Sequence, residues 1–285
     1  MISQTDWSEV EVAAVRQKSR LVTCKNLQPL KILNPGTSYD SCHVVLSSYG
    51  GGMVSGDQIR LKVSCGARTR LFLSSQSNTK IFKAIYDAPA EQTIAGEVAA
   101  DALAVIFPDP VVMQEHSRYR QVQHWRLHST ALLLVIDWFH SGRMDLGEQF
   151  QFTEFHSELK VTVEDRVMLV DRFRFTPAEH IAASPANFAQ YQTMFSAYLV
   201  GSPQDVRFIQ LAAKFAQLQM PERNDLDFSM TERPYVLSVS PVKEGVYVLR
   251  AMGKTRLDLQ PLCEELMQEL SQEAFFGYNP LRRKY

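Results

Sequence analysis

Alternation of apolar and polar residues at every second position is the feature that most constrains this chain. The clearest case is residues 58–65, where isoleucine, leucine and valine alternate with arginine, lysine and serine. A period of two is typical of a β-strand with one buried face. Comparable short runs recur up to about Phe175, and turn sequences such as Asn34-Pro35-Gly36 separate them. Residues 1–175 are therefore predicted to be rich in strands.

After Phe175 the apolar spacing becomes that of helices. Ser184-Pro185 has the form of an N-cap serine followed by proline at the first helical position, and aromatic residues continue at helical spacing to Tyr198. A second helix is predicted after Ser202-Pro203, and a third from about Pro261 to a stop near Gly277. We expect about three α-helices in residues 176–285, with exposed aromatic residues at positions 188, 195, 208 and 215 available to partners.

A strand pair is predicted within this C-terminal part, at Tyr235–Val239 and Val246–Ala251, joined by a turn at Glu244-Gly245. The chain contains no low-complexity linker and no repeat of fixed period. The fold class predicted is mainly β, in a single domain over residues 1–285. Its strand-rich part is 1–175, and a helical layer with a hairpin occupies 176–285.

Composition limits the classes of function. Of the 285 residues, 45% are hydrophobic and 21% charged, which is ordinary for a globular protein with a sizeable core. A net charge of −1 does not favour a nucleic-acid or anionic-membrane binder. The start is polar and acidic, unlike a secretory signal, and the apolar run 131–139 is too short to span a membrane. The four cysteines lack Cys-x-x-Cys spacing, so we expect reduced thiols and a cytoplasmic protein.

The glycine-rich segment 50–56 invites a phosphate-loop interpretation, but its spacing does not fit. A dinucleotide fingerprint requires glycine where Ser55 stands, and it opens a helix rather than a strand. Gly253-Lys254-Thr255 lacks the earlier glycine of a P-loop, because position 248 is valine. No Gly-x-Ser-x-Gly elbow is present either. We therefore predict no catalytic residue and no nucleotide bound by this chain.

Histidine spacing leaves two interpretations open. His124 and His128 share one face of a predicted strand, either as part of a polar row facing solvent or as metal ligands. No His-Glu-x-x-His motif and no Cys/His quartet occurs, so a tightly held metal is not expected. A protein that passes an ion onward should instead bind it weakly, at several hydrated polar positions. The polar cluster Ser74–Lys80, with Asp57 before it, suits that role, or else its hydroxyls satisfy backbone groups at a strand end.

Several segments, in order and spacing, resemble the signature of the UreD/UreH family of urease accessory proteins. The matching segments cover most of residues 35–175: Gly50–Asp57, Ser74–Gln76, Pro108–Pro110, Ser117–Gln121, Asp137–Arg143, Gly147-Glu148 with Phe150, and Asp171–Phe173. Ser55 stands where the family usually carries another glycine, and Ser74-Ser75 replaces a commoner threonine pair.

The resemblance implies a non-enzymatic scaffold with a β-rich, helically wound fold. It implies that the protein binds UreF, which recruits the GTPase UreG, and that the complex docks on apo-urease. Nickel would pass through in transit, with no tightly bound cofactor. Candidates for a transient nickel path are then Asp57, Ser74, Ser75, Thr79, Asp137 and Glu148.

Two other hypotheses remain open from the sequence. One is a β-rich hydrolase or metal-dependent enzyme, which would require four side chains to converge in a pocket: Asp137, His140, Asp145 and Glu148. The other is an interaction module unrelated to urease.

Overall fold

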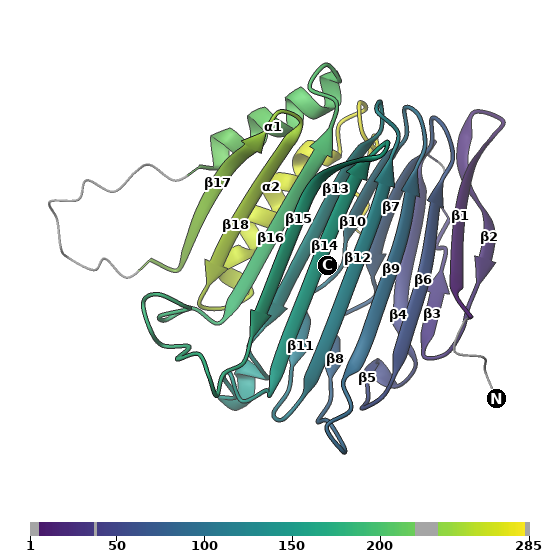
Figure 1. Cartoon of the computed structure of the whole chain (residues 1–285). Coiled ribbons are helices and arrows are strands. Elements are labelled where there is room, and N and C mark those ends of the chain that lie inside the picture. Colours follow the sequence, from purple (N-terminus) through teal and green to yellow (C-terminus); the bar gives the residue numbers. More distant parts are fainter. Residues whose placement is uncertain (1–5, 37–38, 220–232, 283–285) are drawn as a thin grey trace, which may run out of the picture.

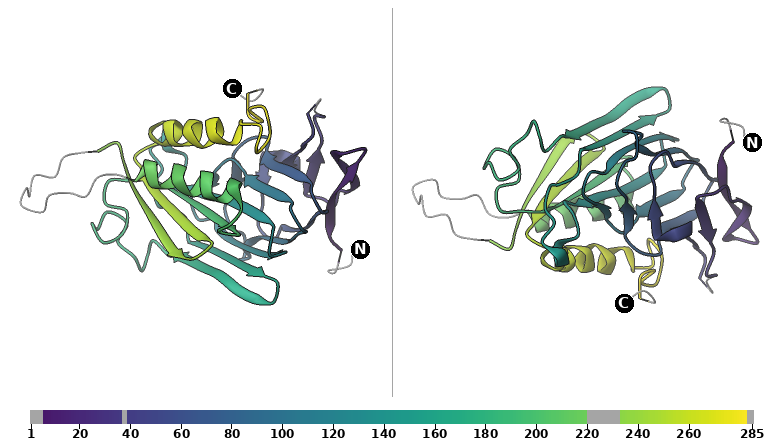
Figure 2. Two further views of the ribbon diagram at one scale, coloured as in Figure 1. Left: turned by 90° about the horizontal axis from the view of Figure 1, so that it is seen from above. Right: turned by 90° about the horizontal axis from the view of Figure 1, so that it is seen from below.

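Two β-sheets stacked face to face make up most of the molecule (Figure 1). The computed structural model describes residues 6–36, 39–219 and 233–282. Two α-helices form a third layer against one sheet, and the two views along the strands show the layers edge-on (Figure 2). A mainly β fold is therefore confirmed.

Sheet A has seven strands and sheet B has eleven. In spatial order, the strands of sheet A are β15 (Arg166–Phe175), β14 (Glu154–Val163), β12 (Arg118–Leu127), β9 (Ala90–Val98), β6 (Gln58–Cys65), β1 (Ser8–Val15) and β2 (Lys18–Lys25). Those of sheet B are β17 (Tyr235–Lys243), β18 (Val246–Gly253), β16 (Thr193–Gly201), β13 (Leu132–His140), β10 (Leu103–Phe107), β7 (Arg70–Ser75), β4 (Cys42–Ser48) and β3 (Leu30–Leu33). Three short strands extend sheet B at one end: β5 (Gly52–Met53), β8 (Thr79–Ile81) and β11 (Val111–Met113).

The chain winds helically between the sheets. From β6 it passes to β7 in sheet B, returns to β9 in sheet A, crosses to β10, and continues through β12, β13 and β14 in the same way. Each return places a strand parallel to its predecessor, so β6, β9, β12 and β14 are parallel neighbours. The same holds for β4, β7, β10 and β13 in sheet B. The helical winding implied by the family resemblance is confirmed.

Burial explains why the strands of the two sheets differ in sequence. Strand β12 alternates between buried and exposed positions, because one face packs between the sheets and the other meets water. Strand β13 is buried at every position except Asp137, where the chain is half-buried. Its odd positions face sheet A and its even positions face the helices. A continuous apolar run is typical of a strand with both faces covered.

Helices α1 (Val206–Leu218) and α2 (Gln260–Leu270) cover the outer face of sheet B. Apolar residues of both helices, among them Phe215 and Leu266, pack with Leu134 and Leu249 of the sheet. Among the residues that the structure describes, three short 3₁₀ helices complete the elements: η1 (Tyr49–Gly51), η2 (Met144–Leu146) and η3 (Leu257–Leu259). Within the described residues, the helices are all too short or too polar to cross a membrane.

The prediction of about three α-helices was wrong, because the described residues form two. The segment after Ser184-Pro185 is a series of turns, and Thr193–Gly201 is strand β16. This strand pairs antiparallel with β13 and β18 over its whole length. Aromatic residues three and four apart fit a helix, but they also fit a buried strand preceded by a turn. Pairing with β13 and β18 on its two sides makes this segment a strand. The last helix also ends at Leu270, before the predicted stop.

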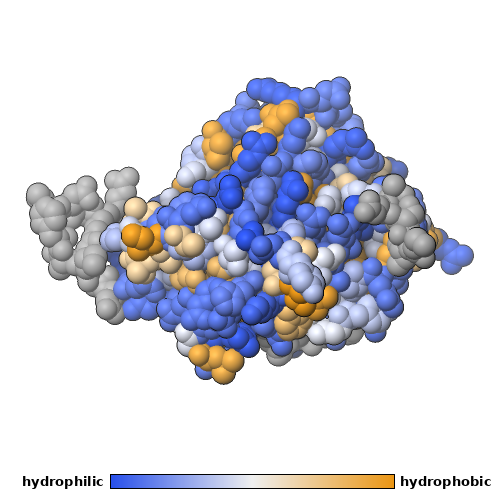
Figure 3. Space-filling model, turned by 60° about the horizontal axis from the view of Figure 1, so that its bottom comes forward, coloured by the Kyte–Doolittle hydropathy of each residue, from blue (hydrophilic) through white to orange (hydrophobic). Residues whose placement is uncertain are grey.

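Aromatic residues of this region are buried rather than exposed. Phe188, Phe195, Phe208 and Phe215 retain at most 4% of their surface. They pack in the two hydrophobic cores, one between the sheets and one under the helices. On the face shown in Figure 3, hydrophobic residues form small separate groups within a largely hydrophilic surface. The expectation that these aromatic residues supply a partner surface was wrong. The predicted hairpin, in contrast, is present as β17 and β18.

Replacing Asp205 with alanine should destabilise the fold through the first turn of α1. The Asp205 side chain is the N-cap and accepts a hydrogen bond from the Arg207 backbone nitrogen at 2.8 Å. Loss of such a cap costs about 1 kcal/mol. Urea unfolding of Asp205→Ala should show this loss, whereas Asp205→Asn keeps an acceptor and should lose less. Equal losses in both variants would contradict a capping role.

Candidate functional site

A polar cluster lies between the two sheets around Asp137. The carboxylate projects from β13 towards sheet A, where Gln121 of β12 donates to Oδ1 at 2.6 Å. Ser157 of β14 donates to Oδ2 at 2.7 Å. Gln121 also donates to Ser157 Oγ at 2.9 Å, so the three side chains form a closed triangle of hydrogen bonds. Parallel pairing of β12 and β14, in which Gln121 lies opposite Ser157, places both donors beneath the carboxylate.

Burial raises the pKa of Asp137 above its ordinary value. The hydrogen bonds from Ser157 and Gln121 oppose this effect, and the nearby charge of Asp171 adds to it. Asp171 itself accepts a hydrogen bond from Tyr198 and forms an ion pair with Arg250. The inter-sheet space therefore holds two carboxylates that influence each other: Asp137 is hydrogen-bonded to neutral groups, whereas Asp171 also faces the Arg250 guanidinium.

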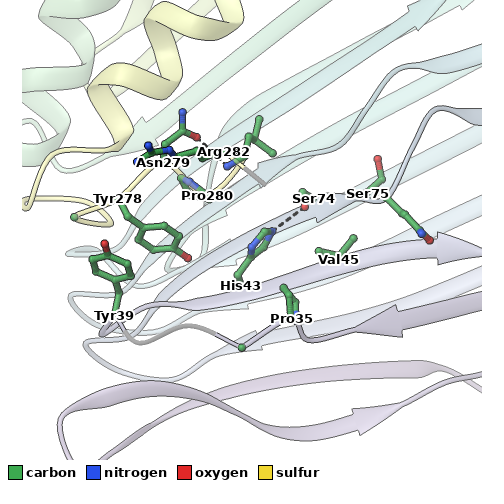
Figure 4. Close-up of a pocket in the computed structure, with 14 residues that line it drawn as sticks. Pro35, Tyr39, His43, Val45, Ser74, Ser75, Tyr278, Asn279, Pro280 and Arg282 are labelled. Atoms are coloured by element: carbon green, nitrogen blue, oxygen red, sulfur yellow. Dashed lines mark hydrogen bonds between the residues drawn. The ribbon is translucent and has the colours of Figure 1, made fainter. Parts of the chain in front are cut away.

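Ser74 and Ser75 mark a second polar region, at the end of β7. Ser74 Oγ lies 3.0 Å from His43 Nε2. Ser75 Oγ donates to Asp109 Oδ2 at 3.0 Å and accepts from the Asp109 backbone nitrogen at 2.7 Å. Both serines line a pocket of about 710 Å³ (Figure 4). The stacked rings of Tyr39 and Tyr278, 4.3 Å apart, stand at one side of this pocket.

Thr79 and Asp57 have local structural contacts. The backbone nitrogen of Thr79 donates to Pro110 at 3.1 Å where β8 meets the turn before β11. Asp57 Oδ2 accepts from the Val54 backbone nitrogen at 2.8 Å and closes the turn that leads into β6. Glycine at position 56 has φ of +82°, which is the reason this turn requires glycine. The glycine-rich segment is thus a bend before a strand and does not open a helix.

Glu148 is buried in the loop after β13. It is 5% exposed and forms an ion pair with Arg143 through Oε2. Its other oxygen, Oε1, is buried and makes no hydrogen bond within the described part of the chain. Position 142 requires glycine, since a Cβ there would lie 2.4 Å from the Glu148 carbonyl oxygen. A buried carboxylate oxygen without a donor is a position that a cation could use.

The four residues of the enzyme hypothesis do not converge. Asp137 faces sheet A, whereas His140 is three residues further along β13 and faces the opposite side, next to Trp138. His140 Nδ1 lies 2.7 Å from Thr193 Oγ1, and burial, with a smaller contribution from Arg256, lowers its pKa to about 4. Asp145 is exposed in η2. Across residues 6–36, 39–219 and 233–282, no three His, Cys, Asp or Glu side chains are grouped to hold a metal.

Of the two interpretations of His124 and His128, the structure favours the polar row that faces solvent. His124 projects from the outer face of sheet A, with its Nε2 3.5 Å from Glu158. His128 follows the end of β12 and lies 3.9 Å from Glu164. Both side chains are about half exposed, at 54% and 44%. Their environment is that of a polar, solvent-facing row.

Sequence reasoning missed the partners of Asp137. Gln121 and Ser157 occupy inward positions of strands whose inward residues are mostly apolar, such as Tyr119 and Phe155. A polar residue on the buried face of an alternating strand needs a partner across the sheet. That signal was available, but the partner could not be identified without knowing how the sheets stack.

The fold and these clusters define a class of protein: a helically wound β double layer with polar groups enclosed between its sheets. The chain matches the family model described as UreD urease accessory protein over residues 7–284. It therefore belongs to the UreD family of urease accessory proteins, as the signature segments predicted.

Relatives named urease accessory protein come from bacteria and plants. The UreD of Cytophaga hutchinsonii is 33% identical over 282 residues, covering 98% of both chains. The UreD of Sorangium cellulosum is 30% identical over 96% of this chain and 83% of its own. Urease accessory protein D of rice (Oryza sativa subsp. indica) is 34% identical over 57% of this chain and 54% of its own.

Proposed function

We propose that this chain is a non-enzymatic scaffold for urease maturation in the cytoplasm. In this proposal it binds UreF and, through UreF, the GTPase UreG, and it docks on apo-urease to assist nickel insertion. Membership of the UreD family supports the general role. The separation of Asp137 from His140 and Asp145 removes the catalytic pocket that the competing enzyme hypothesis needs.

Nickel is the cargo in this proposal, and the space between the sheets is its path. The observation that carries it is the triangle of Asp137, Gln121 and Ser157. Carboxylate, amide and hydroxyl oxygens bind a divalent ion weakly when few are negatively charged, and weak binding permits onward transfer. Glu148 offers a second carboxylate oxygen with no donor within the described residues.

The remaining candidates, Ser74, Ser75, Asp57 and Thr79, belong to the ends of the proposed nickel path. Ser74 and Ser75 open on the pocket of Figure 4, and their hydroxyls would share an incoming ion with Asp109. Asp57 and Thr79 lie at the turn before β6 and at the start of β8. Their side chains would act only as transient, hydrated contacts.

A pull-down with purified partners tests the scaffold role. The tagged chain should retain UreF alone, UreG only when UreF is present, and apo-urease. Retention of UreG without UreF would contradict the order of assembly. Failure to retain any of the three under conditions in which the chain is folded would contradict the scaffold role itself.

A further inference from the structure

The outer face of sheet A is uncovered. Both helices lie on sheet B, and within the described residues no helix packs on the outside of β6, β9, β12 or β14 (Figure 2). Parallel sheets usually have both faces covered by other elements. Here most outward positions are polar, with Ala95, Val122 and Val170 among the exceptions, so water can solvate the exposed face. A largely polar sheet face is nevertheless available to another molecule.

Charge on this face differs from that of the whole chain. Its outward side chains on β6, β9, β12, β14 and β15 include eight cations and four carboxylates, whereas the chain carries a net charge of −1. The cations are Arg60, Lys62, Arg118, Arg120, Arg126, Lys160, Arg172 and Arg174, and the carboxylates are Glu91, Glu97, Glu154 and Glu158. The face thus has a positive balance on a chain whose net charge is −1, which favours oriented association with an acidic partner.

Ion pairs on the face hold the cations in place without neutralising them. Glu154 is shared between Arg118, at 3.5 Å, and Arg174, at 2.7 Å. Glu158 is shared between Arg172, at 2.8 Å, and His124, at 3.5 Å. Because Glu154 serves two arginines and the face has four carboxylates for eight cations, positive charge remains in excess. Side chains already ordered by such pairs lose less conformational entropy when a partner binds.

Three cations on the face, Arg60, Lys62 and Lys160, have no carboxylate partner in the described part of the chain, and Lys62 lies over the Trp7 ring instead. Arg60 donates to the neutral side chain of Gln58 at 3.0 Å, and Lys160 forms no ion pair within the described residues. Strand β9 lies between β6 and β12, and its central outward residues are the short Thr93 and Ala95. Carboxylate side chains of a partner could therefore approach the strand surface and reach cations from both neighbouring strands.

We propose that the outer face of sheet A docks onto a carboxylate-rich protein surface within the urease-maturation complex. This inference rests on the scaffold role proposed above. An acidic protein fits better than a nucleic acid for two reasons. The interleaved glutamates would repel phosphates, and the outward positions of the five strands carry no phenylalanine, tyrosine or tryptophan on which bases could stack. A protein surface can place carboxylates against the arginines and basic groups against the glutamates.

Charge reversal tests this surface. The wild-type chain, Lys160→Glu and Arg60→Glu/Lys160→Glu are titrated against immobilised apo-urease and, separately, against immobilised UreF–UreG complex. Lys31→Glu, on β3 of sheet B, is the matched control, because it makes the same change of charge on another exposed strand. Urea midpoints establish that all variants are folded.

With at least one of the two partners, the double variant should bind about tenfold more weakly than wild type. The affinity of Lys160→Glu should lie between those of the double variant and wild type, and Lys31→Glu should bind like wild type. High salt should reduce the difference in affinity between the double variant and wild type. Equal binding by all variants to both partners would overturn the docking face but leave the scaffold role intact. Absence of wild-type binding to both partners would overturn both proposals. Charge-dependent binding only to a DNA duplex or to phosphatidylserine vesicles would overturn the choice of an acidic protein.

Discussion

Gly96→Ala is expected to destabilise the protein by about 3 kcal/mol, an unusually large effect for adding one methyl group. Gly96 on β9 lies directly opposite Trp125 on β12, and the indole covers the glycine. A Cβ at position 96 would lie 2.0 Å from Cε3 of the indole and 2.2 Å from Cζ3. Trp125 is only 1% exposed, so a rigid ring in a packed core would have to move.

Urea unfolding measures this loss, with Thr93→Val as a control on the outer face of the same strand. The control should change the free energy of unfolding by no more than about 0.5 kcal/mol. Combining Gly96→Ala with Trp125→Leu should cost less than the sum of the two single changes, since the clash disappears with the ring. Additive losses, or a Gly96→Ala variant as stable as the control, would contradict the packing of Trp125 on Gly96.

Asp137→Asn is expected to leave the fold and the complex intact while reducing the nickel content of urease about tenfold or more. The amide has the shape of the carboxylate, and it can accept from Gln121 and donate to Ser157. It carries no charge, however, and is a poor ligand for a divalent ion. Nickel per urease is measured by elemental analysis of enzyme from cells that express the variant.

The matched control for this prediction is Asp145→Asn. Asp145 is exposed in η2, so the same chemical change there should leave nickel loading unchanged. Normal nickel content in the Asp137→Asn strain would remove Asp137 from the proposed path. Equal losses in both variants would indicate a general effect of removing acidic residues.

The raised pKa of Asp137 gives a pH test of its burial that does not depend on nickel. In the unfolded chain this carboxyl has its ordinary pKa of 3.8, and in the folded chain the pKa is higher. As pH rises above 3.8, the unfolded state loses the proton first, so the wild-type protein loses stability relative to Asp137→Asn. Asp137→Asn should therefore lower the free energy of unfolding by less at pH 7.5 than at pH 4. An equal cost at both pH values would contradict the burial.

Local patterns were sufficient to predict some elements and not others. Strand β6, the hairpin β17–β18 and the capped helix α1 each follow from spacing or capping residues within one segment. Residues 185–198 were assigned to a helix because their aromatic spacing fits two structures. Residues 193–198 form part of strand β16 because pairing with β13 and β18 satisfies the backbone hydrogen bonds of this strand on both sides.

The candidate site was predictable only in part, for a related reason. Asp137 interrupts an apolar run, so the sequence alone marks it as unusual. Its partners, Gln121 and Ser157, come from strands of the other sheet, and only the stacking of the two sheets brings them to the carboxylate. Glu148 could be selected by type, but the burial of its Oε1 without a donor among the described residues is visible only in the folded loop, where its backbone lies close to Gly142.

The nickel content of urease in cells that lack this chain is the most direct test of the central claim. The gene is deleted in the native host, no nickel is added, and urease is purified for elemental analysis and activity. Apo-urease should accumulate with little nickel and little activity, and expression of the intact chain in the same strain should restore both. Fully nickel-loaded, active urease in the deletion strain would contradict a role for this chain in urease maturation.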